Sequence, residues 1–193
     1  MSNHAQEMGM SRIGFGLGAA MLLGSPLAAQ TVTGDAAADM LFAPKLAEVE
    51  IIDTGLLPKD QAKVLEMVAR DQPYYAAIAI SPDEGLMSEA TVAAANHHTL
   101  DAAAAAALAD CNGKKSGATD CAIVAVVRPE GWEARPLQLS SSATEDFANY
   151  AGGALAISAL SGAWGIGGSA DEAIAACAGK TEAATDCAVA ISD

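Results

Sequence analysis

The sequence Ala-Thr-Asp-Cys-Ala occurs twice in this chain, at positions 118–122 and 184–188. In each copy the cysteine follows another cysteine after nine intervening residues, so the chain holds two equally spaced pairs, Cys111 with Cys121 and Cys177 with Cys187. This separation is unlike the roughly two to four residues between the paired ligands of a zinc knuckle. The repetition therefore predicts a duplicated unit in which each pair forms a disulfide bond, although two crossed pairings also satisfy the count.

Each cysteine pair lies within the same predicted order of elements, which is strand, strand, helix, strand. The expected strands are short apolar runs bounded by turn residues, and the expected helices are alanine-rich and begin at a hydroxyl-bearing cap. In the first copy the strands are expected at residues 74–80, 89–95 and 122–127 and the helix at 99–111. In the second copy the strands are expected at residues 154–158, 162–167 and 188–191 and the helix at 169–177.

The two predicted helices differ in length by one turn. Twelve positions separate the cap Thr99 from Cys111, whereas eight separate the cap Ser169 from Cys177. A difference of four residues is close to one turn of an α-helix, so each cysteine is expected on the same face of its helix. Each disulfide would then tie the end of a helix to the start of the last strand.

We expect an α+β fold in which two tandem strand-strand-helix-strand repeats share one antiparallel or mixed sheet. Copy one spans residues 74–128 and copy two spans residues 154–193. The connector at residues 129–153 is expected to contain an edge strand at 136–140 and a helix at 143–150.

An N-terminal extension at residues 30–73 is expected to add one further helix, from Leu57 to about Arg70. Its apolar positions Leu57, Val64, Leu65 and Val68 are expected to face the core.

Residues 1–29 are expected to be a signal peptide. Arg12 precedes an apolar, glycine-rich run at residues 13–23, and residues 25–29 supply small side chains suited to cleavage. The run is too short to span a bilayer. We therefore expect a periplasmic or secreted protein, in a compartment where disulfides form.

The formal net charge of −14 restricts the classes of partner. A surface of this sign repels nucleic acid and anionic lipid, so neither is expected to bind. No membrane span is expected after the signal peptide, because no later run approaches the roughly 20 apolar residues that a spanning helix needs. Aromatic residues make up only 4% of the chain, so an alanine-rich core buries little area per residue and disulfides gain importance.

The second copy contains Ala-Ile-Ser at 156–158, Gly-Ala-Trp-Gly at 162–165, Cys177 and the pair Asp186-Cys187. This pattern resembles an exported bacterial family known only as a domain of unknown function. The run at residues 80–96 is similar to a group of small alphaproteobacterial proteins. Together the resemblance covers about residues 74–193, and the first copy departs from it by lacking the tryptophan between glycines.

Proteins similar to this one often carry the label 5-aminolevulinate synthase, which would imply a pyridoxal phosphate cofactor. The residues argue against that activity, because the enzyme class resembles a much larger fold with a Schiff-base lysine. The lysines after the signal peptide lie in polar helix, loop or linker settings: Lys45, Lys59, Lys63, Lys114, Lys115 and Lys180. An exported domain is also separated from intracellular succinyl-CoA, so we expect no cofactor.

His97 and His98 are the first candidates for a chemical site. Adjacent imidazoles can bind a transition metal or titrate near neutral pH. Neighbouring residues of a strand point to opposite sides, however, which favours a polar strand-to-helix junction without a ligand. His98 directly precedes the cap Thr99 and is expected to face water.

Asp83 and Glu84 are the second candidates. Carboxylates gathered around a turn can hold calcium or act as acid and base, but a solvated hairpin in an acidic protein explains them equally well. Together with His97 and His98, they define the alternative of a metal-binding or enzymatic protein.

Trp132 and Trp164 are candidates for binding a ligand or partner, although each tryptophan also suits a structural role. No catalytic residue is assigned, because the sequence brings no nucleophile, base and orienting group into a known pattern. The leading hypothesis is therefore a noncatalytic exported module that binds a protein, an envelope polymer or a small ligand.

Overall fold

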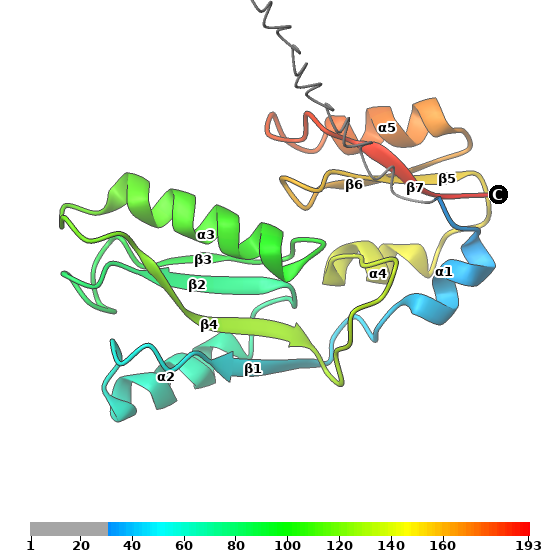
Figure 1. Ribbon diagram of the computed structural model, residues 1–193. Helices are drawn as coiled ribbons and strands as arrows, with labels where there is room; N and C mark the ends of the chain where they lie inside the picture. The colour runs from blue at the N-terminus through cyan, green and yellow to red at the C-terminus, as the bar shows by residue number, and fades with distance from the viewer. Residues whose placement is uncertain (1–30) are drawn as a thin grey trace, which may run out of the picture.

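The computed structural model describes residues 31–193, and the expected signal peptide lies outside them. These residues form five helices and two antiparallel sheets (Figure 1), which confirms the α+β class. The helices are α1 (Gly34–Met40), α2 (Lys59–Ala69), α3 (Leu100–Lys114), α4 (Ser141–Phe147) and α5 (Ala170–Ala178). The strands are β1 (Ala47–Ile51), β2 (Ala76–Ile80), β3 (Val92–Ala94), β4 (Ala122–Pro129), β5 (Ala154–Ile157), β6 (Trp164–Gly167) and β7 (Ala188–Ser192).

The expectation that both copies share one sheet is wrong. The first copy forms a sheet of order β1-β4-β2-β3, and the second forms a separate sheet of order β6-β5-β7. β4 pairs with β1 and Val32 bridges Ile191 of β7, so neither β4 nor β7 pairs with a strand of the other copy. The connector also fails to form the expected strand at 136–140, and Leu137 and Leu139 of this segment are buried in the core of the second unit.

The two units nevertheless repeat one architecture, and both contain the same register shift in the pairing of two strands. In the first unit the pairing of β2 with β4 shifts between Ile78 and Ala79 and leaves out Val124. In the second, the pairing of β5 with β7 shifts between Leu155 and Ala156 and leaves out Ala190. Each omitted residue lies three positions after the second cysteine, so the same β-bulge occurs at the same place in both copies.

Both disulfides form within their own unit, as expected. Cys111 bonds to Cys121 and Cys177 bonds to Cys187, with Cα atoms 6.1 Å apart in each case. The helical cysteines are fully buried, which confirms that the one-turn difference between α3 and α5 preserves the buried face.

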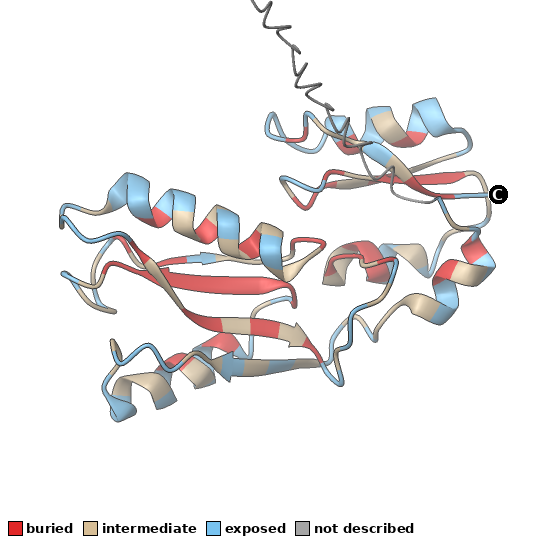
Figure 2. Cartoon of the chain, viewed as in Figure 1, coloured by how far each residue is buried: buried red, intermediate tan, exposed pale blue. Residues whose placement is uncertain are grey.

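A helix can lie close to each sheet because the central strand presents only alanine on that side. Ala77 and Ala79 of β2 face α3, and Ala154 and Ala156 of β5 face α5. The intervening residues of both strands are isoleucine or leucine and point to the opposite side of the sheet, where they enter a larger apolar core. Figure 2 shows this burial concentrated along β2 and β5.

Glycines of β6 bring α5 closer still. A Cβ at Gly165 would lie 2.3 Å from the backbone nitrogen of Cys177, and a Cβ at Gly167 would lie 2.6 Å from that of Ala173. The glycines of the strand expected at residues 162–167 thus allow the backbone of the helix and the backbone of the strand to approach closely.

Helix α2 exposes two of the residues that were expected to face the core. Val64 is 58% exposed and Val68 is 57% exposed, whereas Leu65 and Ala69 are buried. A helix buries a stripe of residues four apart, and successive residues are separated by about 100°, so the stripe through Leu65 and Ala69 excludes positions 64 and 68. No helix within residues 31–193 is long and apolar enough to cross a membrane.

We predict that Gly165→Ala strongly destabilises the protein. The added methyl group has no room between β6 and α5, and overpacking of this kind costs about 1–3 kcal/mol. Urea unfolding measures the loss. Gly113→Ala, near the end of α3, is the matched control, because its Cβ would meet nothing within 4 Å and alanine is favoured in a helix. Equal stability of the two variants would contradict the proposed close approach.

Candidate functional site

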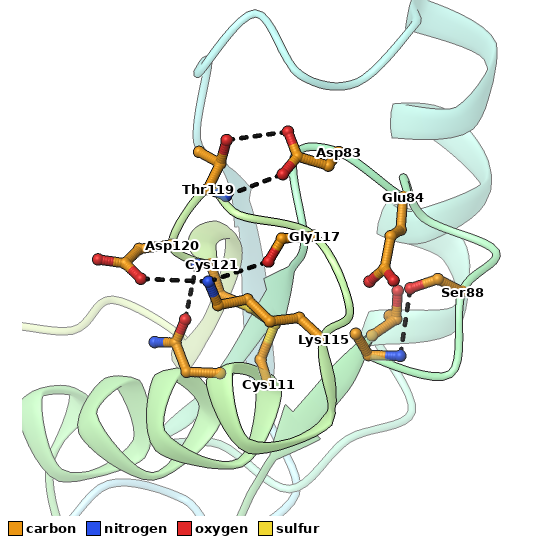
Figure 3. The surroundings of a disulfide bond; sticks show 12 residues. Asp83, Glu84, Ser88, Cys111, Lys115, Gly117, Thr119, Asp120 and Cys121 are labelled. Atoms are coloured by element: carbon orange, nitrogen blue, oxygen red, sulfur yellow. Dashed lines mark hydrogen bonds and ion pairs between the residues drawn. A yellow bond between two sulfur atoms is a disulfide. The ribbon is translucent and has the colours of Figure 1, made fainter.

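In the first unit, the loop closed by the disulfide is fastened to the turn after β2. Asp83 accepts hydrogen bonds from the backbone nitrogen and the hydroxyl of Thr119, at 2.8 and 2.9 Å, and Glu84 accepts one from the backbone nitrogen of Ser116 at 3.1 Å (Figure 3). The bonds from Thr119 hold the pKa of the Asp83 carboxyl below its usual value. Both candidate acids therefore bind the protein's own loop.

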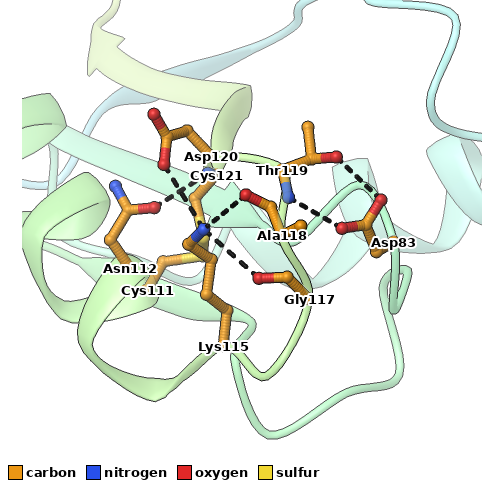
Figure 4. A network of polar contacts seen from close by, with 9 residues as sticks. All are labelled: Asp83, Cys111, Asn112, Lys115, Gly117, Ala118, Thr119, Asp120 and Cys121. Atoms are coloured by element: carbon orange, nitrogen blue, oxygen red, sulfur yellow. Dashed lines mark hydrogen bonds and ion pairs between the residues drawn. A yellow bond between two sulfur atoms is a disulfide. The ribbon is translucent and has the colours of Figure 1, made fainter.

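Lys115 holds the same loop from inside. Its ammonium group donates to the carbonyl oxygens of Gly117 and Ala118, each at 3.3 Å, and lies 3.3 Å from a carboxylate oxygen of Asp120 (Figure 4). The side chain of Asn112 accepts a hydrogen bond from the backbone nitrogen of Cys121 at 3.0 Å. The network closes the loop on itself and supports the disulfide.

The second unit makes the equivalent connection with donor and acceptor exchanged. There the loop supplies the carboxylate: Asp186 accepts a hydrogen bond from the hydroxyl of Ser158 and another from the backbone nitrogen of Leu160 at 3.0 Å. The corresponding aspartate of the first unit, Asp120, instead pairs with Lys115. The acidic residues near both disulfides thus have a shared structural role.

The structure does not gather the four candidates of the metal or enzyme hypothesis. Asp83 and Glu84 contact the disulfide loop, whereas His98 contacts other segments of the chain. Within residues 31–193 no group of three or more His, Cys, Asp or Glu side chains is placed to hold a metal ion.

His98 does not face water as expected; it is 2% exposed and joins three parts of the fold. Its Nδ1 accepts a hydrogen bond from the backbone nitrogen of Ser140 at 3.0 Å, so its Nε2 must carry the proton and donates to the carbonyl of Ala163, also at 3.0 Å. Ser140 belongs to the connector and Ala163 to the second unit. His98 therefore connects both to the first unit.

The residues next to His98 tighten this junction. The side-chain oxygen of Asn96 accepts a hydrogen bond from the backbone nitrogen of Ser142 at 3.0 Å, and a Cβ at Gly162 would lie 2.6 Å from the Asn96 carbonyl oxygen. His97 is also buried, and its Nδ1 has no hydrogen-bond partner among the described residues. Both histidines thus belong to the contact between the units, which adjacency in the sequence alone did not indicate.

Trp132 lies against the core of the first unit. It packs on the main cluster there, with the Arg128 guanidinium 5.5 Å from its ring centroid. The residue is half-buried, and its indole nitrogen is buried without a hydrogen-bond partner among the described residues.

Trp164 instead lines an open groove of about 370 Å³ beside β6. Its indole nitrogen donates to Asp146 at 3.0 Å, and the ammonium group of Lys180 lies 4.9 Å from its ring centroid. Asp146 comes from α4, and Lys180 follows the end of α5. Asn149 and Ala176 complete the walls, so the groove runs between two helices with a strand as its floor.

The residues around Trp164 were missed by sequence reasoning. Asp146 and Lys180 lie 18 and 16 positions away from it, and nothing in the local pattern connects them. Trp164 itself was a candidate from the sequence, within the Gly-Ala-Trp-Gly segment that carries the family resemblance.

No family model matches this chain, and neither a curated protein nor a solved structure is significantly similar to it. The resemblance to an exported family with paired cysteines therefore stays a prediction. The assignment of a function depends on the geometry of the candidate sites.

We predict that the protein loses stability as the pH falls from about 6.5 to 4. Burial lowers the pKa of His98 from 6.5 to about 4, so its contribution is fully present above pH 6.5 and is lost as the unfolded state takes up a proton first. A shift of this size corresponds to about 3 kcal/mol. Urea unfolding at pH 7, 6, 5 and 4 measures the slope.

His98→Gln is expected to flatten this slope most, and His97→Gln is expected to flatten it less, because burial also lowers the pKa of His97. An unchanged slope in His98→Gln would show that other groups cause the pH dependence.

Proposed function

We propose that this protein is an exported, noncatalytic binding module, periplasmic or secreted, and that the groove at Trp164 is its binding site. The observation that supports the proposal is the placement of an aromatic ring, a carboxylate and an ammonium group around one open groove. Grooves of this size are within the range of about 300–1,000 Å³ that ligands occupy in proteins. The disulfides are consistent with an oxidising compartment.

The remaining polar candidates support a binding role over a catalytic one. The carboxylates of Asp83 and Asp186 accept hydrogen bonds within the fold, and both ring nitrogens of His98 are engaged with backbone groups. A general base needs a free acceptor within reach of its substrate, and His98 has none to offer because both of its ring nitrogens are engaged. Trp164 and its neighbours, in contrast, face an open volume.

Fluorescence of Trp164 tests the proposal directly. In a Trp132→Phe background, Trp164 is the sole tryptophan, so its emission reports on the groove. Three probe classes are titrated: chitotriose, soluble peptidoglycan fragments and short synthetic peptides. We expect at least one class to give a saturable change with a Kd below about 1 mM, equivalent to about 4 kcal/mol of binding free energy.

Trp164→Ala is expected to abolish binding of the same probe in calorimetry, whereas Trp132→Phe leaves it intact. Saturable binding by none of the three classes, or binding that survives Trp164→Ala, would overturn the proposal.

A further inference from the structure

We propose that the groove takes an extended peptide segment, which adds to the smaller sheet as a fourth strand alongside β6. This inference rests on the proposed binding role of the groove and specifies the partner as a protein segment with a basic, alternating sequence. Strand addition of this kind uses backbone hydrogen bonds for affinity and side-chain pockets for specificity.

The open edge of β6 offers the hydrogen-bonding groups that such a segment needs. β6 is the edge strand, since the sheet order is β6-β5-β7. Ser158 donates its backbone N–H to the carbonyl of Ala163 at 2.8 Å. This bond shows which residue pairs of the β5–β6 ladder are hydrogen-bonded and which are not. Hydrogen-bonded and non-hydrogen-bonded residue pairs alternate along an antiparallel ladder. The N–H and C=O groups of Gly165 and Gly167 therefore point toward β5, while those of Trp164 and Ile166 point away from it.

Nothing within residues 31–193 satisfies these outward groups, because no hydrogen bond beyond the β5–β6 ladder reaches Trp164 or Ile166 through the backbone. The groove lies along this edge, and its lining includes Trp164, Gly165 and Ile166. Figure 1 shows β6 with α5 on one side of its sheet and α4 on the other. An added strand would therefore lie between two helices, with its side chains alternating toward each.

The two walls specify different side chains. The α5 wall presents the small residue Ala176, so the segment needs small or medium apolar residues there, while Lys180 at the end of this wall keeps its ammonium group over the Trp164 ring. The α4 wall presents Asp146 and Asn149, both exposed, which suit lysine or arginine. A net charge of −14 favours a basic segment as well. The same charge opposes pairing of β6 with a second copy of this chain, since like charges repel.

Titrations of the 15N-labelled protein with three synthetic peptides test the inference: (Lys-Val)4, (Glu-Val)4, and (Lys-Val)4 with every backbone amide nitrogen methylated. We expect (Lys-Val)4 to shift the amide signals of β6 and the facing residues of α4 and α5. We expect (Glu-Val)4 to bind at least tenfold more weakly and the methylated peptide to lose binding, because methylation removes its backbone donors.

Two variants add a structural check. Asp146→Asn keeps an oxygen that accepts from the Trp164 indole but removes the negative charge. It should weaken binding of (Lys-Val)4 several-fold while leaving the free energy of unfolding unchanged. Ile166→Pro removes one outward N–H without removing a ladder bond, and should abolish binding. The methylated peptide gives the same information without a variant, should Ile166→Pro fail to fold.

Several outcomes would overturn the inference: equal binding of the methylated peptide, equal binding of (Glu-Val)4, shifts located away from β6, or pairing of two protein copies in sedimentation. Saturable binding of chitotriose or peptidoglycan fragments at Trp164 without peptide binding would overturn strand addition and leave the proposed binding role in place.

Discussion

The close approach of one helix to each sheet is the constraint on which this structure depends. It requires alanine on the facing side of β2 and β5, and in the second unit it requires glycine in β6. Small side chains permit the approach but bury little apolar area, so each interface gains little from the hydrophobic effect. A disulfide between the buried face of the helix and the following strand offsets this weakness by restricting the unfolded chain.

The contact between the two units follows a different principle. It depends on polar groups whose hydrogen bonds are satisfied inside the protein, chiefly those of His98 with Ser140 and Ala163. A buried imidazole that accepts at one nitrogen and donates at the other fixes its two partners in direction as well as distance. The close contact of Gly162 with Asn96 leaves no room for a side chain between the units. The two sheets are thereby held in one arrangement without sharing a strand.

Sequence reasoning succeeded where the signal was local and repeated. Short-range patterns predicted the repeated unit and its disulfides. These patterns are the cysteine spacing, the caps Thr99 and Ser169, and the apolar runs of β2 and β4. It failed where the outcome depended on distant partners. β1 was missed because its alternating pattern is short, and the role of His98 was missed because Ser140 and Ala163 lie 42 and 65 positions away.

The difference between the two edge strands shows how one copy of a duplicated unit acquires a feature that the other lacks. β3 of the first unit has three residues and no glycine, and a short edge strand offers little backbone for pairing with another chain. β6 has four residues with a glycine at every second position, so α5 lies directly against it and Trp164 and Ile166 occupy the opposite side. The glycines that solve a packing problem on one side of β6 therefore leave a flat edge between two helices. The groove at Trp164 is a consequence of how the second helix packs.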